Sequence, residues 1–164
     1  MEQRWLAAVI TVSDSRARHD TENDPSGDAI VARLRELPAD IIDRQLVADV
    51  VDDIRASLRR ALTHAQLVVL SGGTGLGPRD VTPQAVSPLL DYEIPGMSEV
   101  MRREGVRSTP HAVLSRQVAG VSQGRLVIAL PGSPRAVREC LEAIWEALPH
   151  ALRLLAGETA HGGG

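Results

Sequence analysis

The sequence contains no phenylalanine and no lysine, and it has one tyrosine and two tryptophans among 164 residues. Proteins that read single-stranded nucleic acid usually stack the bases on aromatic side chains, and this chain can supply very few. The formal net charge of −3 gives no general attraction to nucleic acid or to an anionic membrane. We therefore expect neither nucleic acid nor membrane as a partner.

The absence of lysine means that all 18 residues in the Lys+Arg count are arginines. Schiff-base chemistry and the lysine of a P-loop are thereby excluded, so a bound phosphate must meet arginine, backbone N–H groups or a metal ion. The single cysteine, Cys140, lies on an apolar stripe with Val137, Leu141 and Ile144, which favours burial over a role as nucleophile. The five histidines show no metal-ligand spacing.

Long apolar runs are also missing. No run is long enough to span a bilayer, and the opening residues Met1–Ser13 lack the charged and apolar regions of a cleavable signal peptide. A reducing compartment suits a chain with one cysteine. The expected localisation is cytoplasmic.

Apolar, β-branched runs predict strands at Trp5–Ser13, Ile41–Val47 and Leu67–Ser71, the first of them central in the sheet. Ser26 is the predicted N-cap of a helix that ends before Pro38. Thr82-Pro83 predicts a capping hydroxyl followed by a proline at the first helical position. Helices are expected at residues 26–37, 51–65, 82–90, 96–106, 135–148 and, after an interruption at Pro149, 151–157.

Strands that alternate with helix-length segments predict right-handed βαβ crossovers. The expected fold class is α/β, with three layers and a mostly parallel central sheet flanked by helices. Gln117–Val121 and Arg125–Leu130 flank Ser122-Gln123-Gly124 and predict a hairpin. We expect a single domain over residues 1–157 and a disordered tail over 158–164. Ligands should gather at the carboxyl ends of the parallel strands.

The most informative stretch is Ser71-Gly72-Gly73-Thr74-Gly75-Leu76-Gly77-Pro78-Arg79-Asp80-Val81-Thr82-Pro83, between a predicted strand and a predicted helix. Glycines let the backbone approach a ligand closely and turn several N–H groups toward an anion. The spacing fits neither a P-loop nor the G-x-G-x-x-G motif. The glycines alone are also compatible with a plain strand-to-helix turn.

Asp80 makes this loop more specific, because a carboxylate about 4 Å from a phosphate is repelled by on the order of 4 kcal/mol at an effective dielectric of 20. A divalent cation reverses the sign of that interaction, and Mg²⁺ typically binds one or two carboxylates together with phosphate oxygens. A metal–phosphate site is one interpretation of Asp80. The other is that Asp80 caps the following helix or pairs with Arg79.

These residues resemble the molybdopterin adenylyltransferases of the MogA/MoaB type, which include the corresponding domains of plant Cnx and animal gephyrin. The resemblance runs from about Trp5 to Gly157, and its most specific block is Gly72-Gly73-Thr74-Gly75 followed by Pro78-Arg79-Asp80-Val81-Thr82-Pro83. Further motifs occur in the family's order: Thr11-Val12-Ser13-Asp14, Asp24 with Ser26-Gly27, Val47-Ala48-Asp49, Ile94-Pro95-Gly96 with Glu99, Leu114-Ser115-Arg116, and Leu130-Pro131-Gly132-Ser133-Pro134.

The resemblance implies a role in molybdenum cofactor biosynthesis, in which ATP and molybdopterin give adenylylated molybdopterin and pyrophosphate. It implies that Asp49 and Asp80 are catalytic and bind Mg²⁺. The implied molybdopterin-binding residues are Ser13, Asp14, Gly72, Gly73, Thr74, Gly75, Ser115 and Arg116. The implied nucleotide-binding residues are Pro131, Gly132, Ser133 and Pro134.

The family also implies a homotrimer or homohexamer and a molybdenum-insertion enzyme as partner. The residues leave open whether molybdenum or tungsten is the eventual metal. Departures from the family pattern are small: Ala48 replaces a frequent Pro, Gln84 a frequent Glu and Ser133 a frequent Asn. None removes a proposed catalytic carboxylate.

Several alternatives remain at this point. Asp49 could cap the helix that follows it, Ser13-Asp14 could be the polar end of a strand, Glu99 could be an exposed helix residue, and Arg116 could face a subunit neighbour. Ser133 before Pro134 is a good N-cap with or without a nucleotide. The whole protein could bind molybdopterin without efficient adenylyl transfer, or form a structural trimer module.

Overall fold

The computed structural model describes residues 3–19 and 23–158, and the tail predicted at 158–164 lies outside them except for Glu158. The strands are β1 (Trp5–Val12), β2 (Ala39–Val47), β3 (Leu67–Ser71), β4 (Tyr92–Glu93), β5 (Val118–Ser122) and β6 (Arg125–Leu130). The α-helices are α1 (Asp14–His19), α2 (Pro25–Leu34), α3 (Val51–Leu62), α4 (Thr82–Val86), α5 (Pro95–Ser108), α6 (Pro134–Ile144) and α7 (Ala147–Leu155). Two short 3₁₀ segments are η1 (Ser87–Leu89) and η2 (Pro110–Leu114).

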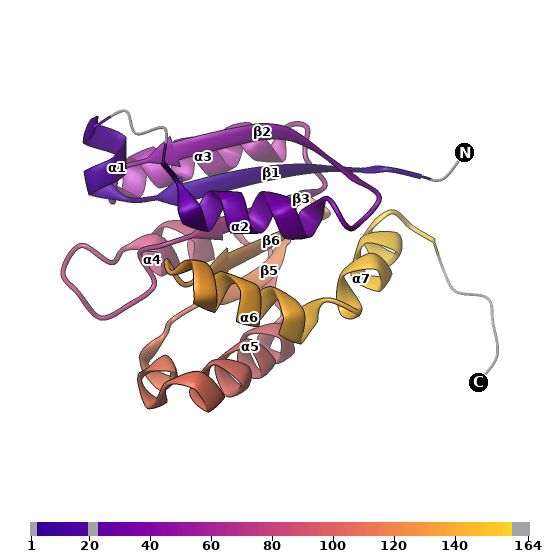
Figure 1. The fold of residues 1–164 in the computed structure, drawn as a ribbon. Coiled ribbons are helices and arrows are strands. Elements are labelled where there is room, and N and C mark those ends of the chain that lie inside the picture. Colours follow the sequence, from indigo (N-terminus) through magenta and orange to yellow (C-terminus); the bar gives the residue numbers. More distant parts are fainter. Residues whose placement is uncertain (1–2, 20–22, 159–164) are drawn as a thin grey trace.

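The strands form one sheet in the order β2-β1-β3-β6-β5-β4 (Figure 1). The first four strands of this order are parallel to one another, and β5 is antiparallel to both of its neighbours, β6 and β4. The predicted mostly parallel sheet, the interior position of β1 and the β5–β6 hairpin are therefore confirmed. Gln123 and Gly124 form the hairpin turn with φ angles of 53° and 73°, the left-handed values that a tight two-residue hairpin turn needs.

Alternate residues of β1, β3 and β6 enter two separate cores. Ala7 and Val9 of β1 pack with residues of α2, α5, α6 and α7, whereas Ala8 and Ile10 pack with residues of α3 and α4. Helices thus cover both faces of the sheet, as the apolar character of β1 predicts (Figure 1). The predicted three-layer α/β architecture is confirmed.

Two predicted helix caps are wrong. The N-cap of α2 is Asp24, whose carboxylate accepts a hydrogen bond from the Gly27 N–H at 3.1 Å, because Pro25 fits the first helical position; Ser26 instead donates to the Gly132 carbonyl. Thr82 does not cap α4, because its hydroxyl donates to the Gly72 carbonyl at 2.7 Å. Both hydroxyls hold distant loops instead.

Other differences concern short elements. Helix α1 at residues 14–19 and the two-residue strand β4 were not predicted. Neither is long enough to show a periodic apolar pattern. The C-terminal helix breaks between Ile144 and Ala147 rather than at Pro149, which lies in the first turn of α7, where its missing N–H has no partner to lose. Over the described ranges, no helix has the length and apolar character needed to cross a bilayer.

Candidate anion and metal site at the carboxyl edge of the sheet

The predicted site residues come together at one edge of the sheet. Strands β1, β2, β3 and β6 run parallel, so the segments that follow their carboxyl ends are neighbours. These segments carry Ser13-Asp14, Asp49, Gly72–Gly75 and Pro131–Pro134, respectively. The Ser13 N–H donates to the Val47 carbonyl, which joins the ends of β1 and β2.

The glycine loop, residues 72–75, has all four of its backbone carbonyls engaged. Thr82 donates to the Gly72 carbonyl through its hydroxyl and to the Gly73 carbonyl through its N–H at 3.0 Å. Arg116 donates to the Thr74 carbonyl through its N–H at 2.8 Å and to the Gly75 carbonyl through its guanidinium at 2.7 and 2.9 Å. The loop is thus held by its carbonyls, from α4 and from the segment before β5.

The N–H groups of the same loop are largely unused. The Gly72 N–H donates to the Leu130 carbonyl, but those of Gly73, Thr74 and Gly75 donate to no acceptor among residues 3–19 and 23–158. Backbone N–H groups need partners, and a run of consecutive unpaired ones forms an anion-binding nest. With every carbonyl tied elsewhere, the loop can offer donors to an anion.

Gly72 and Gly73 are required by the backbone. Their φ angles are +97° and +67°. A Cβ at Gly72 would lie 2.2 Å from the Val12 carbonyl oxygen, and one at Gly73 would lie 2.4 Å from the Thr82 hydroxyl and 3.1 Å from Asp49 Oδ1. The loop therefore passes closely over the ends of β1 and β2, and side chains are excluded there.

Asp49 is fixed by Asp14. The Asp14 N–H donates to Asp49 Oδ2 and the Asp49 N–H donates to Asp14 Oδ1, each at 2.9 Å. Asp14 Oδ2 also pairs with Arg79 at 2.7 Å. The N-cap of α3 is Val50, without a side-chain hydrogen bond, so Asp49 is not the cap of that helix.

Asp80 is turned back onto its own loop. Its Oδ2 accepts the Gly77 N–H at 2.9 Å and would be 2.9 Å from a Cβ at Gly75. The N-cap of α4 is Val81, and the ion pair of Arg79 is with Asp14. Neither alternative role of Asp80, as a helix cap or as the partner of Arg79, is therefore observed.

The Asp49 carboxylate is partly buried and lies near the negative charges of Asp14 and Asp80. Burial raises the pKa of Asp49, and the negative charges of Asp14 and Asp80 raise it further; the hydrogen bond from the Asp14 N–H and the charge of Arg79 act in the opposite direction. Acidic groups that repel one another at a strand end favour a shared cation. No group of three or more His, Cys, Asp or Glu that could hold a metal occurs in the described part of the chain.

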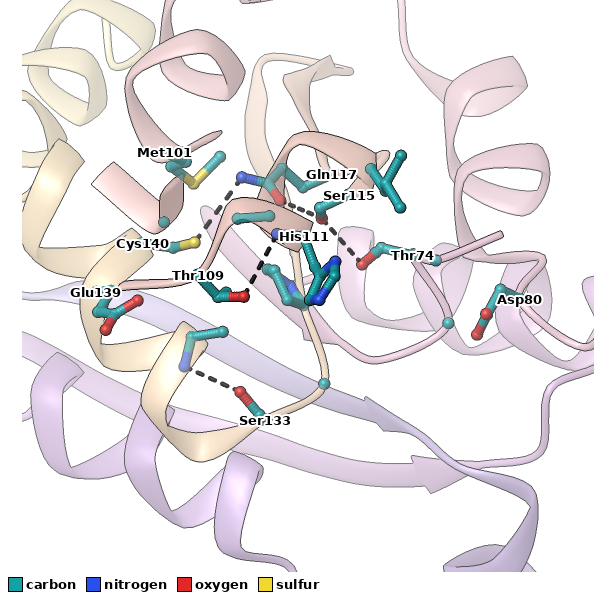
Figure 2. Close-up of a pocket in the computed structure, with 18 of the residues that line it drawn as sticks. Thr74, Asp80, Met101, Thr109, His111, Ser115, Gln117, Ser133, Glu139 and Cys140 are labelled. Carbon is teal, nitrogen blue, oxygen red and sulfur yellow. Dashed lines mark hydrogen bonds between the residues drawn. The ribbon is translucent and has the colours of Figure 1, made fainter. Parts of the chain in front are cut away.

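A larger hollow lies on one side of the glycine loop, with a volume of about 540 Å³ (Figure 2). Its apolar side comes from α5, η2 and α6 and includes Met101, Leu114 and Cys140. Cys140 is buried as predicted, and burial raises the pKa of its thiol to about 12, which makes it a poor nucleophile. The predicted site residues that line this hollow are Gly73, Thr74, Gly75, Asp80, Ser115, Pro131, Gly132 and Ser133.

A smaller hollow of about 270 Å³ lies on the other side of the loop. The predicted site residues that line it are Ser13, Asp49, Gly72, Gly73, Asp80 and Gly132. Ser71 also lines it, and the Ser71 hydroxyl is buried with no hydrogen-bond partner among the described residues. Such a group is rare in a native interior, so Ser71 adds a hydroxyl with unused hydrogen-bonding capacity to the lining of this hollow.

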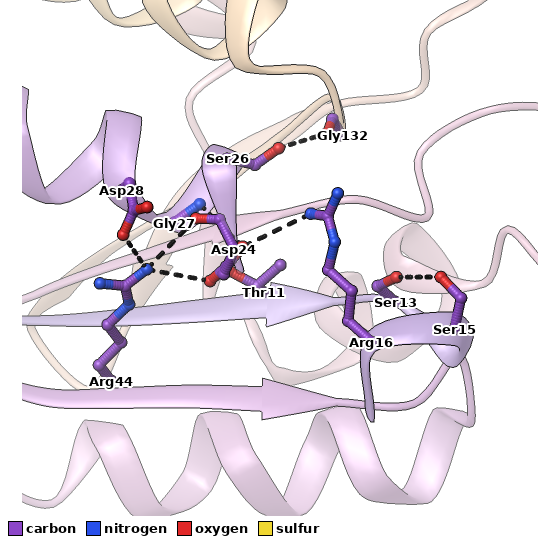
Figure 3. A network of polar contacts seen from close by, with 10 residues as sticks. All are labelled: Thr11, Ser13, Ser15, Arg16, Asp24, Ser26, Gly27, Asp28, Arg44 and Gly132. Atoms are coloured by element: carbon purple, nitrogen blue, oxygen red, sulfur yellow. Dashed lines mark hydrogen bonds and ion pairs between the residues drawn. The ribbon is translucent and has the colours of Figure 1, made fainter. Parts of the chain in front are cut away.

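Arg16 is a further lining residue of the smaller hollow, and sequence reasoning missed it. It lies on α1 and its ion pair with Asp24 is long, at 3.7 Å (Figure 3). The polar segment 14–24 offered no signal that one of its arginines turns toward the site. Asp24, in contrast, is well held by Thr11, Gly27 and Arg44.

Three predicted site residues line neither hollow: Asp14, Arg116 and Pro134. Asp14 acts through Asp49 and Arg79, and Pro134 begins α6, which Ser133 caps by accepting the Ala136 N–H at 3.0 Å. Arg116 donates to the carbonyls of Gly75 and Asp80 and to the Gln84 side chain. These contacts make Arg116 a support of the glycine loop, and its role in binding molybdopterin stays a prediction.

Comparison with known proteins shows which family the chain is similar to. The family model described as "Probable molybdopterin binding domain" matches residues 8–150. The chain is 40% identical over 153 residues to the molybdopterin adenylyltransferase of Helicobacter pylori strain J99, a match that covers 91% of this chain and 86% of that protein. It is 37% identical over 166 residues to gephyrin of Dictyostelium discoideum, covering 94% of this chain but 23% of gephyrin.

The fold is also that of a solved relative. The crystal structure of the molybdopterin biosynthesis enzyme MoaB from Thermus thermophilus has a TM-score of 0.86 and 43% identity, covering 93% of this chain and 97% of MoaB. The family model spans the strand ends and the glycine loop alike. This chain therefore belongs to the family of probable molybdopterin-binding domains.

Proposed function

We propose that this chain acts in molybdenum cofactor biosynthesis as a nucleotidyltransferase that transfers AMP from ATP to the phosphate of molybdopterin. The observation that carries the proposal is the glycine loop, with its carbonyls engaged and three consecutive N–H groups unpaired in the described residues. The names of the relatives support it, since the Helicobacter pylori protein is a molybdopterin adenylyltransferase.

The two hollows suit two substrates. They share Gly73, Asp80 and Gly132, so ligands on either side would meet at the loop. The N–H groups of Gly73, Thr74 and Gly75 would hold the phosphate of molybdopterin there, and Ser13 would contribute a hydroxyl from the smaller hollow. Gly132, within the turn at residues 131–134, would contact the phosphates of the nucleotide.

In the proposed reaction, an oxygen of the molybdopterin phosphate forms a bond to the α-phosphorus of ATP. The bond between that phosphorus and the oxygen bridging to the β-phosphate breaks, and pyrophosphate leaves with the electron pair. A phosphate nucleophile is already ionised near neutral pH, so no general base is needed. The role of the protein is placement and neutralisation of charge.

Asp49 and Asp80 would hold Mg²⁺, and their carboxylates fit it because Mg²⁺ takes one or two carboxylates and completes its shell with water and phosphate oxygens. When bound, Mg²⁺ supplies neutralisation of the charge that the two anions bring together. Asp14 orients Asp49 through the paired hydrogen bonds, and it holds Arg79 beside the site.

The test is to supply the purified protein with molybdopterin, ATP and Mg²⁺ and to look for adenylylated molybdopterin by mass spectrometry and for pyrophosphate. The proposal requires both products, and each must depend on all three components. Binding of molybdopterin without pyrophosphate release would instead identify a binding protein. Omission of ATP is the matched control.

Assembly is a separate prediction. We propose a homotrimer or homohexamer, on the family resemblance, and a molybdenum-insertion enzyme as the downstream partner. Sedimentation velocity tests the first point, and a species that stays at monomer mass over a wide concentration range contradicts it. The adenylyl-transfer proposal does not depend on the outcome, because the residues named for it lie in one chain.

A further inference from the structure

Two polar groups of the larger hollow have hydrogen-bonding capacity that residues 3–19 and 23–158 leave wholly or largely unused, and both lie beside Cys140 (Figure 2). One is the amide nitrogen of Gln117, a donor. The other is the Oε2 atom of Glu139, an acceptor. Both line the hollow outside the glycine loop, and neither was singled out from the sequence.

Gln117 is oriented from the glycine loop. Ser115 donates to the Gln117 Oε1 atom, and the Ser115 hydroxyl also lies 3.4 Å from the Thr74 hydroxyl. With Oε1 occupied, the amide nitrogen has one partner among the described residues, the Cys140 sulfur at 3.8 Å, which is a weak acceptor. Gln117 is 4% exposed, so this donor is buried and under-satisfied.

Glu139 is oriented from two helices. Ser108 of α5 and Arg135 of α6 both donate to its Oε1 atom. These contacts, the Ser108 hydrogen bond first, hold the pKa of Glu139 below its ordinary value, so the group is an ionised acceptor. Its Oε2 atom accepts no hydrogen bond from any residue that the structure describes.

The surfaces around these two groups are apolar. Met101 and Cys140 lie between α5 and α6, and Ala112 of η2 approaches α5 so closely that a Cβ at Gly105 would lie 2.9 Å from the Ala112 Cβ. Apolar walls with a few placed polar groups are typical of sites for small ring systems. A ring placed here has its hydrogen-bonding edge toward a donor and an acceptor.

We propose that Glu139 and Gln117 together recognise the pyrimidine edge of the pterin: the Glu139 carboxylate accepts from the 2-amino group, and the Gln117 amide donates to the 4-oxo group. This inference rests on the proposed function. A pterin presents two adjacent donors, the 2-amino group and N3–H, followed by a carbonyl acceptor. Adenine presents its amino donor directly beside a ring-nitrogen acceptor, whereas a pterin separates its 2-amino donor and 4-oxo acceptor by N3–H, so the two edges differ in the spacing that Glu139 and Gln117 would read.

The arrangement also links recognition to the reacting end of the substrate. Gln117 is connected through Ser115 to Thr74 of the glycine loop. A pterin held by its edge would therefore lie in a fixed relation to the loop that receives its phosphate. Glu139 and Gln117 act here as specificity and positioning residues, away from the reacting atoms.

The experiment uses two fluorescent probes, pterin and lumazine, which carries an oxo group in place of the 2-amino group. Wild-type protein should bind pterin more tightly than lumazine by about 10- to 100-fold, the range expected for a hydrogen bond to a charged group. Glu139→Gln should lose that preference. Glu139→Asp, which keeps the charge, should retain part of it.

Glu142→Gln is the matched control, because Glu142 lies on the same helix but pairs with Arg33 outside the hollow. It should leave both affinities unchanged. AMP binding should be unchanged in every variant. The inference is overturned if wild-type protein does not bind pterin, if Glu139→Gln keeps the preference for pterin over lumazine, or if that variant loses AMP binding instead.

The same samples separate this inference from the proposed function. If wild-type protein forms adenylylated molybdopterin while the pterin preference survives in Glu139→Gln, the inference fails and the function stands. If the preference depends on Glu139 but no pyrophosphate is released from ATP and molybdopterin, the inference stands and the function fails. Thermal melting of each variant shows that the fold is intact.

Discussion

The two hollows share a wall but differ in chemistry. The larger has Met101, Cys140 and Leu114 on its apolar side, whereas the smaller has Arg16 and the hydroxyls of Ser13 and Ser71. An apolar slot suits a ring system, and a polar hollow with a cation suits phosphates. The difference supports the proposal that substrate recognition is divided between the two sides. Asp80, one of the two carboxylates proposed for chemistry, lies at the shared wall, and Asp49 lines the smaller hollow.

Loss of the shared carboxylate should have the largest effect. Asp80→Asn can keep the hydrogen bond from the Gly77 N–H but removes the negative charge that would hold a cation. Turnover should fall by about 100- to 1,000-fold, the loss typical of removing an electrostatic contribution to the transition state. Pterin binding should stay measurable, because the larger hollow keeps its shape.

Steady-state pyrophosphate release and pterin fluorescence measure these two quantities on the same sample. Asp52→Asn, an exposed position in the first turn of α3, is the control. Undiminished turnover in Asp80→Asn would show that Asp80 is not needed for the reaction. It would then contradict the proposal that the two substrates react at the wall shared by the hollows.

The glycine loop itself should be the next most sensitive feature. Gly72→Ala puts a methyl group 2.2 Å from the Val12 carbonyl at a φ of +97°. We expect a loss of about 2–4 kcal/mol in the free energy of unfolding, from a strained backbone and a steric clash. Gly96→Ala is the control, because a methyl group there would meet no described atom within 4 Å beyond its chain neighbours and its own helix.

Urea denaturation of both variants provides the comparison. Both hollows should suffer together in Gly72→Ala, because the loop forms a wall of each. Equal stability of the two variants would contradict the close approach of the loop to β1.

Arg16→Gln should sharpen the contrast between the hollows, with a smaller effect. Arg16 lines the smaller hollow but not the larger one, and its ion pair with Asp24 is long. Binding of ATP should weaken by about tenfold, the value of one charge-assisted hydrogen bond. Pterin binding should not change, and isothermal titration with each ligand measures both. An equal loss for the two ligands would show that the hollows do not divide recognition.

The smallest effect should be in the pH dependence of stability. The pKa of Asp49 is raised in the folded chain above its ordinary value of 3.8, mainly by burial. The folded chain therefore holds this proton more tightly than the unfolded chain does, so this group lowers stability as the pH rises from 3.8 through the raised pKa. Asp49→Asn should remove that decline.

Chemical denaturation of wild type and Asp49→Asn between about pH 3 and 7 tests the sign. The gain in stability of the variant over wild type should grow as the pH increases. A gain that shrinks with increasing pH would mean that Asp49 is stabilised in its charged form, and would count against repulsion between Asp49 and Asp80.

The fold was largely predictable from the sequence because β1 and β3 are apolar on both faces, and only helices on both sides of a sheet can cover them. Short elements escaped prediction: α1 and β4 are too short for a periodic signal. Ser26 and Thr82 were misassigned because a hydroxyl near a helix start looks like a cap, and its actual partner lies far along the chain.

The sequence predicted which segments form the site but not which contacts their side chains make. The glycine loop and Asp80 stand out by composition, and the parallel strands place Asp49 beside them. The sequence could not show that Arg116 is engaged by backbone carbonyls or that Arg16 turns inward. Glu139 lies on an amphipathic helix, and nothing in the sequence distinguishes it from the other polar residues of that helix. Only the structure shows that Ser108 of the neighbouring helix α5 orients its carboxylate.

The way in which Arg116 and Thr82 hold the glycine loop has a consequence for protein engineering. The segment from Gly72 to Gly75 takes its shape from donors that come after it in the chain, one of them 41 positions beyond Gly75. Grafted alone into another scaffold, the four residues would lose every one of those restraints. A transplant that keeps the shape of the glycine loop must also carry the start of α4 with Thr82 and an arginine placed as Arg116 is. Otherwise the host must supply equivalent hydrogen-bond donors.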